Sequence, residues 1–222
     1  ADARPGERAR PSRAGVSVAR VPGCGPGRRG AGRPGREGPV AAVLGVVLAG
    51  GASRRYGTPK AFAAVGGERI VDRVLRALGA VVDRVGIVAN DLAAYAPLGY
   101  PVRPDARPGA GALGGIYTAV AWAREEGCTG ALCVACDMPF VAPDLLREPV
   151  RDARPDDVVV PASGSRRGLE PLCAYYGVGC LGPIERALDR GDRAIVAFFP
   201  EVRVRRLEPA IVSRFGPPER LF

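Results

Sequence analysis

Short apolar runs and longer amphipathic segments alternate along most of the chain. Apolar runs of strand length occupy 43–48, 84–90, 131–136, 157–161, 172–176 and 202–207, and segments with helical spacing occupy 70–79, 109–126, 143–151 and 182–190. In the first of these helices, Ile70, Val74 and Leu78 recur every four residues, as a single buried face requires. Because strands alternate with helices, we predict an α/β fold: one three-layer α/β/α domain with a mostly parallel sheet.

Two of the apolar runs differ from the others. The run 172–176 has no helical segment between it and the run 157–161, so we expect it to be antiparallel, as the edge of a ribbon. The run 202–207 alternates Val with Arg, which is typical of an exposed edge strand. The segment 96–108 is rich in Pro and predicts no long element.

The first 40 residues differ in composition from the rest of the chain. They contain nine Arg and only three acidic residues, and so contribute +6 of the net charge of +9. They have almost no apolar periodicity and are rich in Gly and Pro, which predicts disorder. We therefore expect a disordered segment over 1–40 and one folded domain over 41–222. No aromatic residues lie among these arginines to stack on bases, so no nucleic-acid partner is expected.

A possible targeting signal begins at Arg28-Arg29, which the apolar run 40–48 follows in the manner of a twin-arginine export signal. Two features argue against this signal: Glu37 stands just before the short apolar run, and cleavage after that run would destroy the most informative loop of the sequence. No run approaches the roughly 18 apolar residues needed to cross a bilayer. We expect a cytoplasmic protein that does not associate with membranes.

The residue types exclude several kinds of chemistry. The chain has no histidine, which excludes histidine bases, triads and metal ligands. Its six cysteines lack zinc-finger spacing. Cys133 and Cys136 lie three residues apart in one predicted strand, so they should point to opposite faces as buried free thiols.

The stretch from Gly45 to Lys60 has the order strand, glycine turn, cations, and reads GVVLAGGASRRYGTPK. Adjacent glycines at Gly50 and Gly51 let backbone N–H groups converge on an anion, which suits phosphate. Arg55 and Lys60 would neutralise the charge of a triphosphate. Lys60 is the only lysine among 32 basic residues, which indicates that this position needs an ammonium group.

Carboxylates follow at two further places. Asp137 comes directly after the apolar run 131–136, and Asp105 stands shortly before a glycine cluster at 109–115. In open α/β sheets, ligands bind at the carboxyl ends of the strands, so these residues should share one site with the first glycine loop. Magnesium takes one or two carboxylates and otherwise phosphate oxygens and water. The sequence therefore predicts a nucleoside triphosphate site with Mg²⁺ bound to Asp137.

The second glycine cluster leaves another interpretation open. Gly109, Gly111 and Gly114 form a literal G-x-G-x-x-G at the start of a predicted helix, which is a dinucleotide-binding pattern. A Pro-rich segment precedes this pattern in place of an apolar strand. A nicotinamide-dependent reductase would also leave Gly50, Arg55 and Lys60 without a role.

Three segments, in this order, resemble the molybdenum cofactor guanylyltransferases among the nucleotidyltransferases. They are LAGGASRRYGTPK at 48–60, Asp105 through GALGGI at 111–116, and CDMPF at 136–140. The resemblance implies a Rossmann-like nucleotidyltransferase domain that transfers GMP from GTP to the molybdenum-pterin cofactor. Molybdoenzymes and cofactor-delivery proteins are candidate partners.

The resemblance and the residue chemistry described above together suggest roles for individual residues. Arg55, Lys60 and Asp137 would be catalytic, and Asp137 would also hold Mg²⁺. Nucleotide binding would involve Leu48, Ala49, Gly50, Gly51, Lys60, Asp105 and Asp137. The segment Gly191-Asp192-Arg193 is similar to the family's G-x-R segment on the acceptor side.

The chain also departs from the family pattern. Tyr56 stands at a Met position, the strand end at 88–90 keeps one Asn, and the C-terminal N-x-N-T-P-E pattern appears as Arg214 to Glu219 without either Asn. These departures leave three alternatives open: CTP as the nucleotide, a different phosphorylated acceptor, or a nucleotide-binding module without transfer activity.

Overall fold

A seven-stranded sheet forms the centre of the fold in the computed structural model, which describes residues 42–50, 60–165 and 167–222. The strand order is β5-β4-β1-β6-β8-β7-β9. The strands are β1 (Val43–Leu48), β4 (Arg84–Val88), β5 (Val102–Arg103), β6 (Gly130–Ala135), β7 (Asp157–Pro161), β8 (Cys173–Gly177) and β9 (Arg203–Leu207). A separate two-stranded antiparallel hairpin pairs β2 (Ala64–Val65) with β3 (Glu68–Arg69).

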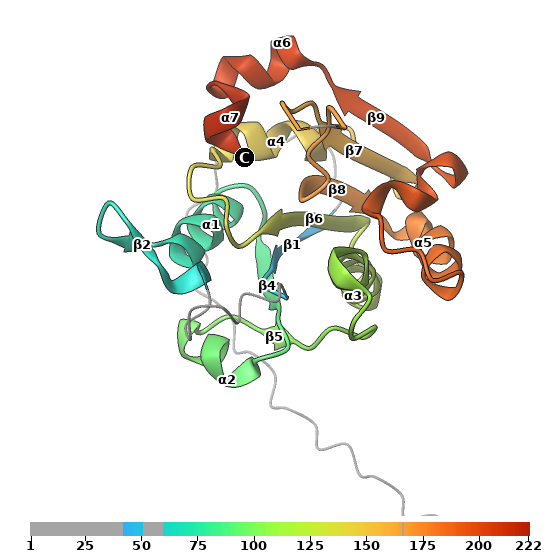
Figure 1. Ribbon diagram of the computed structural model, residues 1–222, viewed down its shortest axis with the longest axis horizontal. Coiled ribbons are helices and arrows are strands. Elements are labelled where there is room, and N and C mark those ends of the chain that lie inside the picture. Colours follow the sequence, from blue (N-terminus) through green and yellow to red (C-terminus); the bar gives the residue numbers. More distant parts are fainter. Residues whose placement is uncertain (1–41, 51–59, 166) are drawn as a thin grey trace, which may run out of the picture. The chain divides into compact units, whose positions relative to one another are not determined.

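Helices cover both faces of the sheet (Figure 1). The α-helices are α1 (Ile70–Gly79), α2 (Leu92–Tyr95), α3 (Gly111–Glu125), α4 (Pro143–Val150), α5 (Leu181–Asp189), α6 (Pro209–Val212) and α7 (Pro218–Leu221). Short 3-10 helices span Lys60–Phe62, Ala96–Leu98, Val178–Cys180, Ile195–Glu201 and Ser213–Phe215. Side chains of α3 and α5 pack in the core on one face, and those of α1 and α4 pack in the core on the other. The predicted three-layer α/β/α architecture is confirmed.

Parallel pairing brings the carboxyl ends of three strands together. Leu48 of β1 is in register with Val88 of β4 and with Ala135 of β6. Backbone hydrogen bonds extend this alignment beyond the strands: Ala49 N–H donates to the Val88 carbonyl at 2.8 Å, and Cys136 N–H donates to the Leu48 carbonyl at 3.1 Å. The segments that follow these strands therefore start from one edge of the sheet.

A close contact fixes α3 against the sheet. Trp122 of α3 lies over Gly86 of β4, where an added Cβ would come within 2.1 Å of the indole ring. The Arg103 guanidinium lies 4.6 Å from the centre of the same ring, as a cation–π contact. Gly86 is therefore required by packing, because the sheet and the helix approach closely at this point.

The run 172–176 forms an antiparallel strand, as predicted, but this strand does not lie at the edge of the sheet, as was also predicted. β8 is antiparallel to β6 and β7, but it lies between them and all five of its residues are buried. The hydroxyls of its two tyrosines have backbone acceptors: Tyr175 donates to the Thr129 carbonyl at 2.9 Å and Tyr176 to the Pro171 carbonyl at 2.6 Å. These bonds allow the phenols to be buried. β9 lies at the edge of the sheet, as predicted.

The cysteines are free thiols where the structure describes them, as predicted, but Cys136 follows the end of β6 and is only partly buried. Cys133 belongs to the core beneath α3 and α5, whereas Cys136 packs against the core on the opposite face. The thiols at 128, 133, 136, 173 and 180 are free, and Cys24 lies outside the described residues. The predicted boundary at residue 40 also lies outside them and stays a prediction.

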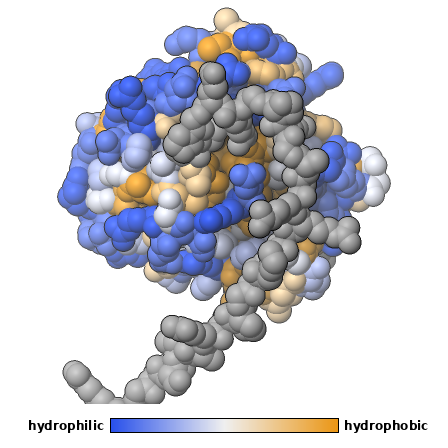
Figure 2. Space-filling view, turned by 180° about the vertical axis from the view of Figure 1, so that it is seen from behind, coloured by the Kyte–Doolittle hydropathy of each residue, from blue (hydrophilic) through white to orange (hydrophobic). Residues whose placement is uncertain are grey.

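Hydrophilic residues make up most of the visible coloured surface in Figure 2, and hydrophobic residues occupy smaller areas between them. Within the described part of the chain, no helix has the length and apolar character to cross a membrane.

Candidate active site

A cavity of about 430 Å³ opens at the carboxyl ends of β1, β4 and β6. Six of the residues predicted to form the site line it: Leu48, Ala49, Gly50, Lys60, Asp105 and Asp137. They come from three separate segments, which the parallel register brings to one edge of the sheet. The other two predicted residues, Gly51 and Arg55, lie outside the described residues.

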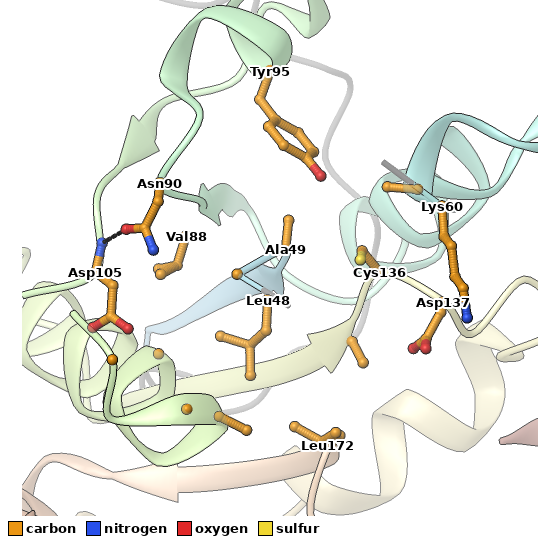
Figure 3. A pocket seen from close by; sticks show the side chains of 17 residues that line it. Leu48, Ala49, Lys60, Val88, Asn90, Tyr95, Asp105, Cys136, Asp137 and Leu172 are labelled. Carbon is orange, nitrogen blue, oxygen red and sulfur yellow. Dashed lines mark hydrogen bonds between the residues drawn. The ribbon is translucent and has the colours of Figure 1, made fainter. Parts of the chain in front are cut away.

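One end of the cavity carries opposite charges on two exposed side chains. Lys60 begins the 3-10 helix that follows the first glycine loop, and the buried Ala61 anchors this turn in the core. Asp137 follows β6 directly. Figure 3 shows both side chains at the same end of the cavity, with no hydrogen bond drawn between them. The ammonium and the carboxylate are therefore available to a ligand with its own charges.

A hydrogen-bonded loop forms the other end. The Asp105 N–H donates to Oδ1 of Asn90 at 3.0 Å, which leaves the Asn90 amide nitrogen as a donor (Figure 3). Oδ1 of Asp105 accepts hydrogen bonds from the Arg107 N–H at 2.9 Å and from the buried Thr118 hydroxyl at 3.1 Å. The second oxygen of Asp105 faces α3. These bonds hold the Asp105 carboxylate in a fixed position at the cavity wall.

Asn90 was missed as a site residue by the sequence interpretation, which treated the loss of neighbouring Asn residues as weakening this position. Its place directly beyond the β4 strand end was the available signal. Thr118 carried no signal, because a single threonine inside an apolar helix has no sequence pattern that distinguishes it.

Glycines allow α3 to pack closely against the loop that carries Asp105. At Gly114, an added Cβ would lie 2.9 Å from the Arg107 carbonyl oxygen and 3.0 Å from Oδ2 of Asp105. Gly109 and Gly111 have φ values of +81° and +69°, which other residues rarely adopt. The second glycine cluster thus borders the same cavity as Lys60 and Asp137, and Gly111 starts the helix whose N-terminus is favourable to anions.

The phenol of Tyr95 and the thiol of Cys136, which both line the cavity, stay protonated at neutral pH. Burial, followed by the charge of Cys136, raises the pKa of Tyr95 to about 12. Burial, followed by the charge of Asp137, raises the pKa of the Cys136 thiol to about 11. Burial also raises the pKa of Glu170, and the negative charge of Asp137 raises this pKa further. Neither the phenol nor the thiol can serve as a base near neutrality, so the site is suited to binding and charge neutralisation.

A second cavity, of about 330 Å³, lies beside the first glycine of the cluster. It is lined by the loop 106–110 and by Gly191, Asp192 and Arg193, the segment predicted to lie on the acceptor side. Arg107 connects the two walls, because its guanidinium pairs with Glu185 at 2.9 Å and with Asp189 at 3.3 Å on α5. The acceptor role of this segment stays a prediction.

The fold and the cavity define an α/β protein whose candidate site lies at the carboxyl ends of parallel strands. The sequence profile of the MobA-like NTP transferase domain matches residues 45–207. The chain belongs to this family of nucleotidyltransferases, and the resemblance found in the three motifs is confirmed.

Individual relatives agree with this assignment. A probable molybdenum cofactor guanylyltransferase from Pelotomaculum thermopropionicum is 41% identical, over 73% of this chain and 77% of the relative. A molybdenum cofactor guanylyltransferase from Desulfosudis oleivorans is 37% identical, over 79% of this chain and 86% of the relative. Among solved structures, a protein from Aquifex aeolicus is 26% identical with a TM-score of 0.67, and the match covers 84% of this chain and 96% of that one.

Proposed function

We propose that this chain transfers GMP from GTP to the phosphate of the molybdenum-pterin cofactor, with release of pyrophosphate, to form the guanine dinucleotide cofactor. The observation that carries the proposal is the single cavity in which Lys60, Asp137, Asn90 and Asp105 meet in a member of the MobA-like family. Two relatives with 41% and 37% identity bear the name of this activity, which supports the choice of nucleotide and acceptor.

The charges suggest how the nucleotide lies in the cavity. Phosphates belong at the end with Lys60, because a compact ammonium group offsets their charge. The nucleoside then reaches the end with Asn90 and Asp105, where one amide nitrogen and one carboxylate oxygen remain available for its polar atoms. The first glycine loop begins at this cavity with Gly50, and amides of Gly50 and Gly51 would bind phosphate oxygens.

Asp137 fits the role of a magnesium ligand. No group of three or more metal-binding side chains occurs in the ranges that the structure describes, which argues against an all-protein metal cage there. Magnesium instead takes one or two carboxylates together with phosphate oxygens and water, and Asp137 is exposed at the phosphate end of the cavity. When bound, the ion would offset negative charge on the phosphates.

The chemistry requires positioning more than proton transfer. An oxygen of the acceptor phosphate attacks the α-phosphorus of GTP in line, the new P–O bond forms, and the bond to the bridging oxygen of pyrophosphate breaks. The acceptor phosphate is already ionised at neutral pH, so it needs no general base, and the absence of histidine is no obstacle. Lys60 and Arg55 would neutralise charge on the departing pyrophosphate.

Pyrophosphate release tests the proposal. The purified protein is supplied with Mg²⁺ and molybdopterin, and GTP, CTP and ATP are compared, with mass spectrometry of the pterin product. We expect release and a guanine dinucleotide product with GTP. Release only with CTP would identify CTP as the substrate in place of GTP. Nucleotide binding without release would show a nucleotide-binding module that lacks this transfer activity.

A further inference from the structure

Tyr95 is a buried residue whose hydroxyl makes no hydrogen bond to another described residue. The side chain is 2% exposed and lines the cavity, and Figure 3 shows it pointing from the end of α2 into the cavity. The two other deeply buried tyrosines, Tyr175 and Tyr176, both donate to backbone carbonyls. With its hydroxyl pointing into the cavity, Tyr95 is placed to contact a ligand.

The position of this ring is fixed by its neighbours. The ring of Phe62 lies 5.1 Å from that of Tyr95, centre to centre. Phe62 ends the 3-10 helix that begins with Lys60. The contact between the Phe62 and Tyr95 rings therefore joins Tyr95 to the turn that carries Lys60. At the start of α2, the Asp91 carboxylate caps the helix by accepting from the Ala94 N–H at 3.1 Å. Because the ring packs on Phe62 and the helix that carries it is capped, the Tyr95 hydroxyl has a defined position in the cavity.

That place is on the phosphate side. In Figure 3 the Tyr95 hydroxyl is directed towards the side of the cavity with Cys136 and Lys60, whereas Asn90 and Asp105 form the opposite wall. Burial and the nearby Cys136 and Asp91 raise the pKa of Tyr95 to about 12, so the hydroxyl keeps its proton and is available as a donor. A neutral donor beside a lysine suits an anionic oxygen.

We propose that the Tyr95 hydroxyl donates a hydrogen bond to a phosphate oxygen of the bound nucleotide. This role rests on the proposed function, because it requires a nucleoside triphosphate in the cavity. It adds a nucleotide-binding residue from α2 to those of the strand ends, and it makes Phe62 a residue that positions Tyr95 and Lys60 together.

Tyr95→Phe removes only the hydroxyl and is the variant of choice. Binding of GTP, GMP and guanosine is measured by calorimetry with Mg²⁺, and Tyr100→Phe, at a tyrosine that is 37% exposed and outside the cavity lining, is the control. We expect the affinity for GTP and GMP to fall about 10- to 100-fold in Tyr95→Phe, as for one lost hydrogen bond to a charged group, with guanosine binding unchanged. The melting temperature of the ligand-free protein should not fall, because no hydrogen bond within the described chain is lost.

Three results would overturn the role of Tyr95. They are wild-type affinity for GTP in Tyr95→Phe, an equal loss of affinity for guanosine, or a clear drop in the melting temperature of the ligand-free variant. If the wild-type protein itself binds no nucleotide, the proposed function fails and the role of Tyr95 fails with it. Nucleotide binding by the wild type that Tyr95→Phe leaves unchanged rejects the role of Tyr95 alone.

Discussion

The two halves of the sheet use the same kind of element for different purposes. In the half formed by β5, β4, β1 and β6, all neighbouring strands are parallel, so their carboxyl ends meet and the cavity forms there. In the half formed by β8, β7 and β9, the reversed β8 breaks this alignment. Parallel register therefore brings residues that are distant in sequence into one site in the first half, whereas the strands of the second half complete the hydrophobic core.

Charge is also used differently in the two halves. At the cavity, Lys60 and Asp137 are exposed and stay available to a ligand. At the start of β7, Asp157 is 1% exposed, and the guanidinium of Arg203 holds its carboxylate with bonds of 2.6 and 2.9 Å. Substitutions in the first half should therefore change binding and turnover, and those in the second should change stability.

The largest effect is expected at Asp137. Asp137→Asn keeps the size of the side chain but removes the charge that would hold the metal, so turnover should fall by about 100-fold or more, with a smaller loss of GTP affinity. Steady-state pyrophosphate release and calorimetry measure the two quantities. Asp83→Asn, at an exposed residue before the amino end of β4, is the control and should be neutral. Near wild-type turnover of Asp137→Asn would refute its role.

Lys60→Met should weaken GTP binding roughly 10- to 100-fold, as expected for a lost hydrogen bond between charged groups. Lys60→Arg should restore only part of this affinity, because a planar fork does not replace a compact ammonium group. Arg124→Met removes an exposed charge near the far end of α3 and should not change binding at moderate salt. Full affinity in Lys60→Met would place the phosphates elsewhere.

Asp157→Asn should lower the free energy of unfolding by about 1–2 kcal/mol, because it breaks an ion pair with a buried carboxylate and a half-exposed Arg203. GTP affinity should not change. Denaturant unfolding measures the effect, with the exposed neighbour Asp156→Asn as the control. An unchanged unfolding midpoint would show that the pair contributes no stability.

The pH dependence gives a second test of this pair. Burial opposes ionisation of Asp157, but the hydrogen bonds from Arg203 and the Arg154 N–H outweigh it and lower the pKa below its ordinary value of 3.8. The stabilisation is therefore present above pH 3.8 and is lost as the pH falls through the lowered pKa. The difference between wild type and Asp157→Asn should shrink in this acid range. A constant difference from pH 7 to pH 2.5 would contradict the assignment.

The smallest effect is expected at Asn90. Asn90→Ala removes the acceptor for the Asp105 N–H and the remaining amide donor, so GTP affinity should fall about fivefold. Asn90→Asp keeps the acceptor but replaces the donor with a negatively charged oxygen, and Asn90→Ser, which has a hydroxyl donor and no charge, is the control for this charge. Equal losses in Asn90→Ala and Asn90→Asp would assign the role to the donor, whereas full affinity in Asn90→Asp would show that Asn90 only positions the Asp105 loop.

Sequence patterns predicted six of the seven strands of the central sheet, the main helices and six residues of one cavity, because local periodicity and glycine loops are recorded along the chain. They missed the two-residue β5 in the Pro-rich segment and the hairpin of β2 and β3. They placed β8 at an edge, whereas it lies between β6 and β7. The acceptors that allow Tyr175 and Tyr176 to be buried there lie at Thr129 and Pro171, outside the strand itself. Asn90 and Tyr95 acquire their places from strand register and from the contact with Phe62. Such relations depend on the folded chain and leave no local pattern.

A crystal structure with GTP and Mg²⁺ tests the central claim most directly. We predict one nucleotide in the cavity at the carboxyl ends of β1, β4 and β6, with phosphates beside Lys60, Asp137 and the Tyr95 hydroxyl and the nucleoside beside Asn90 and Asp105. A nucleotide bound elsewhere, or bound here in the reverse direction, would contradict it.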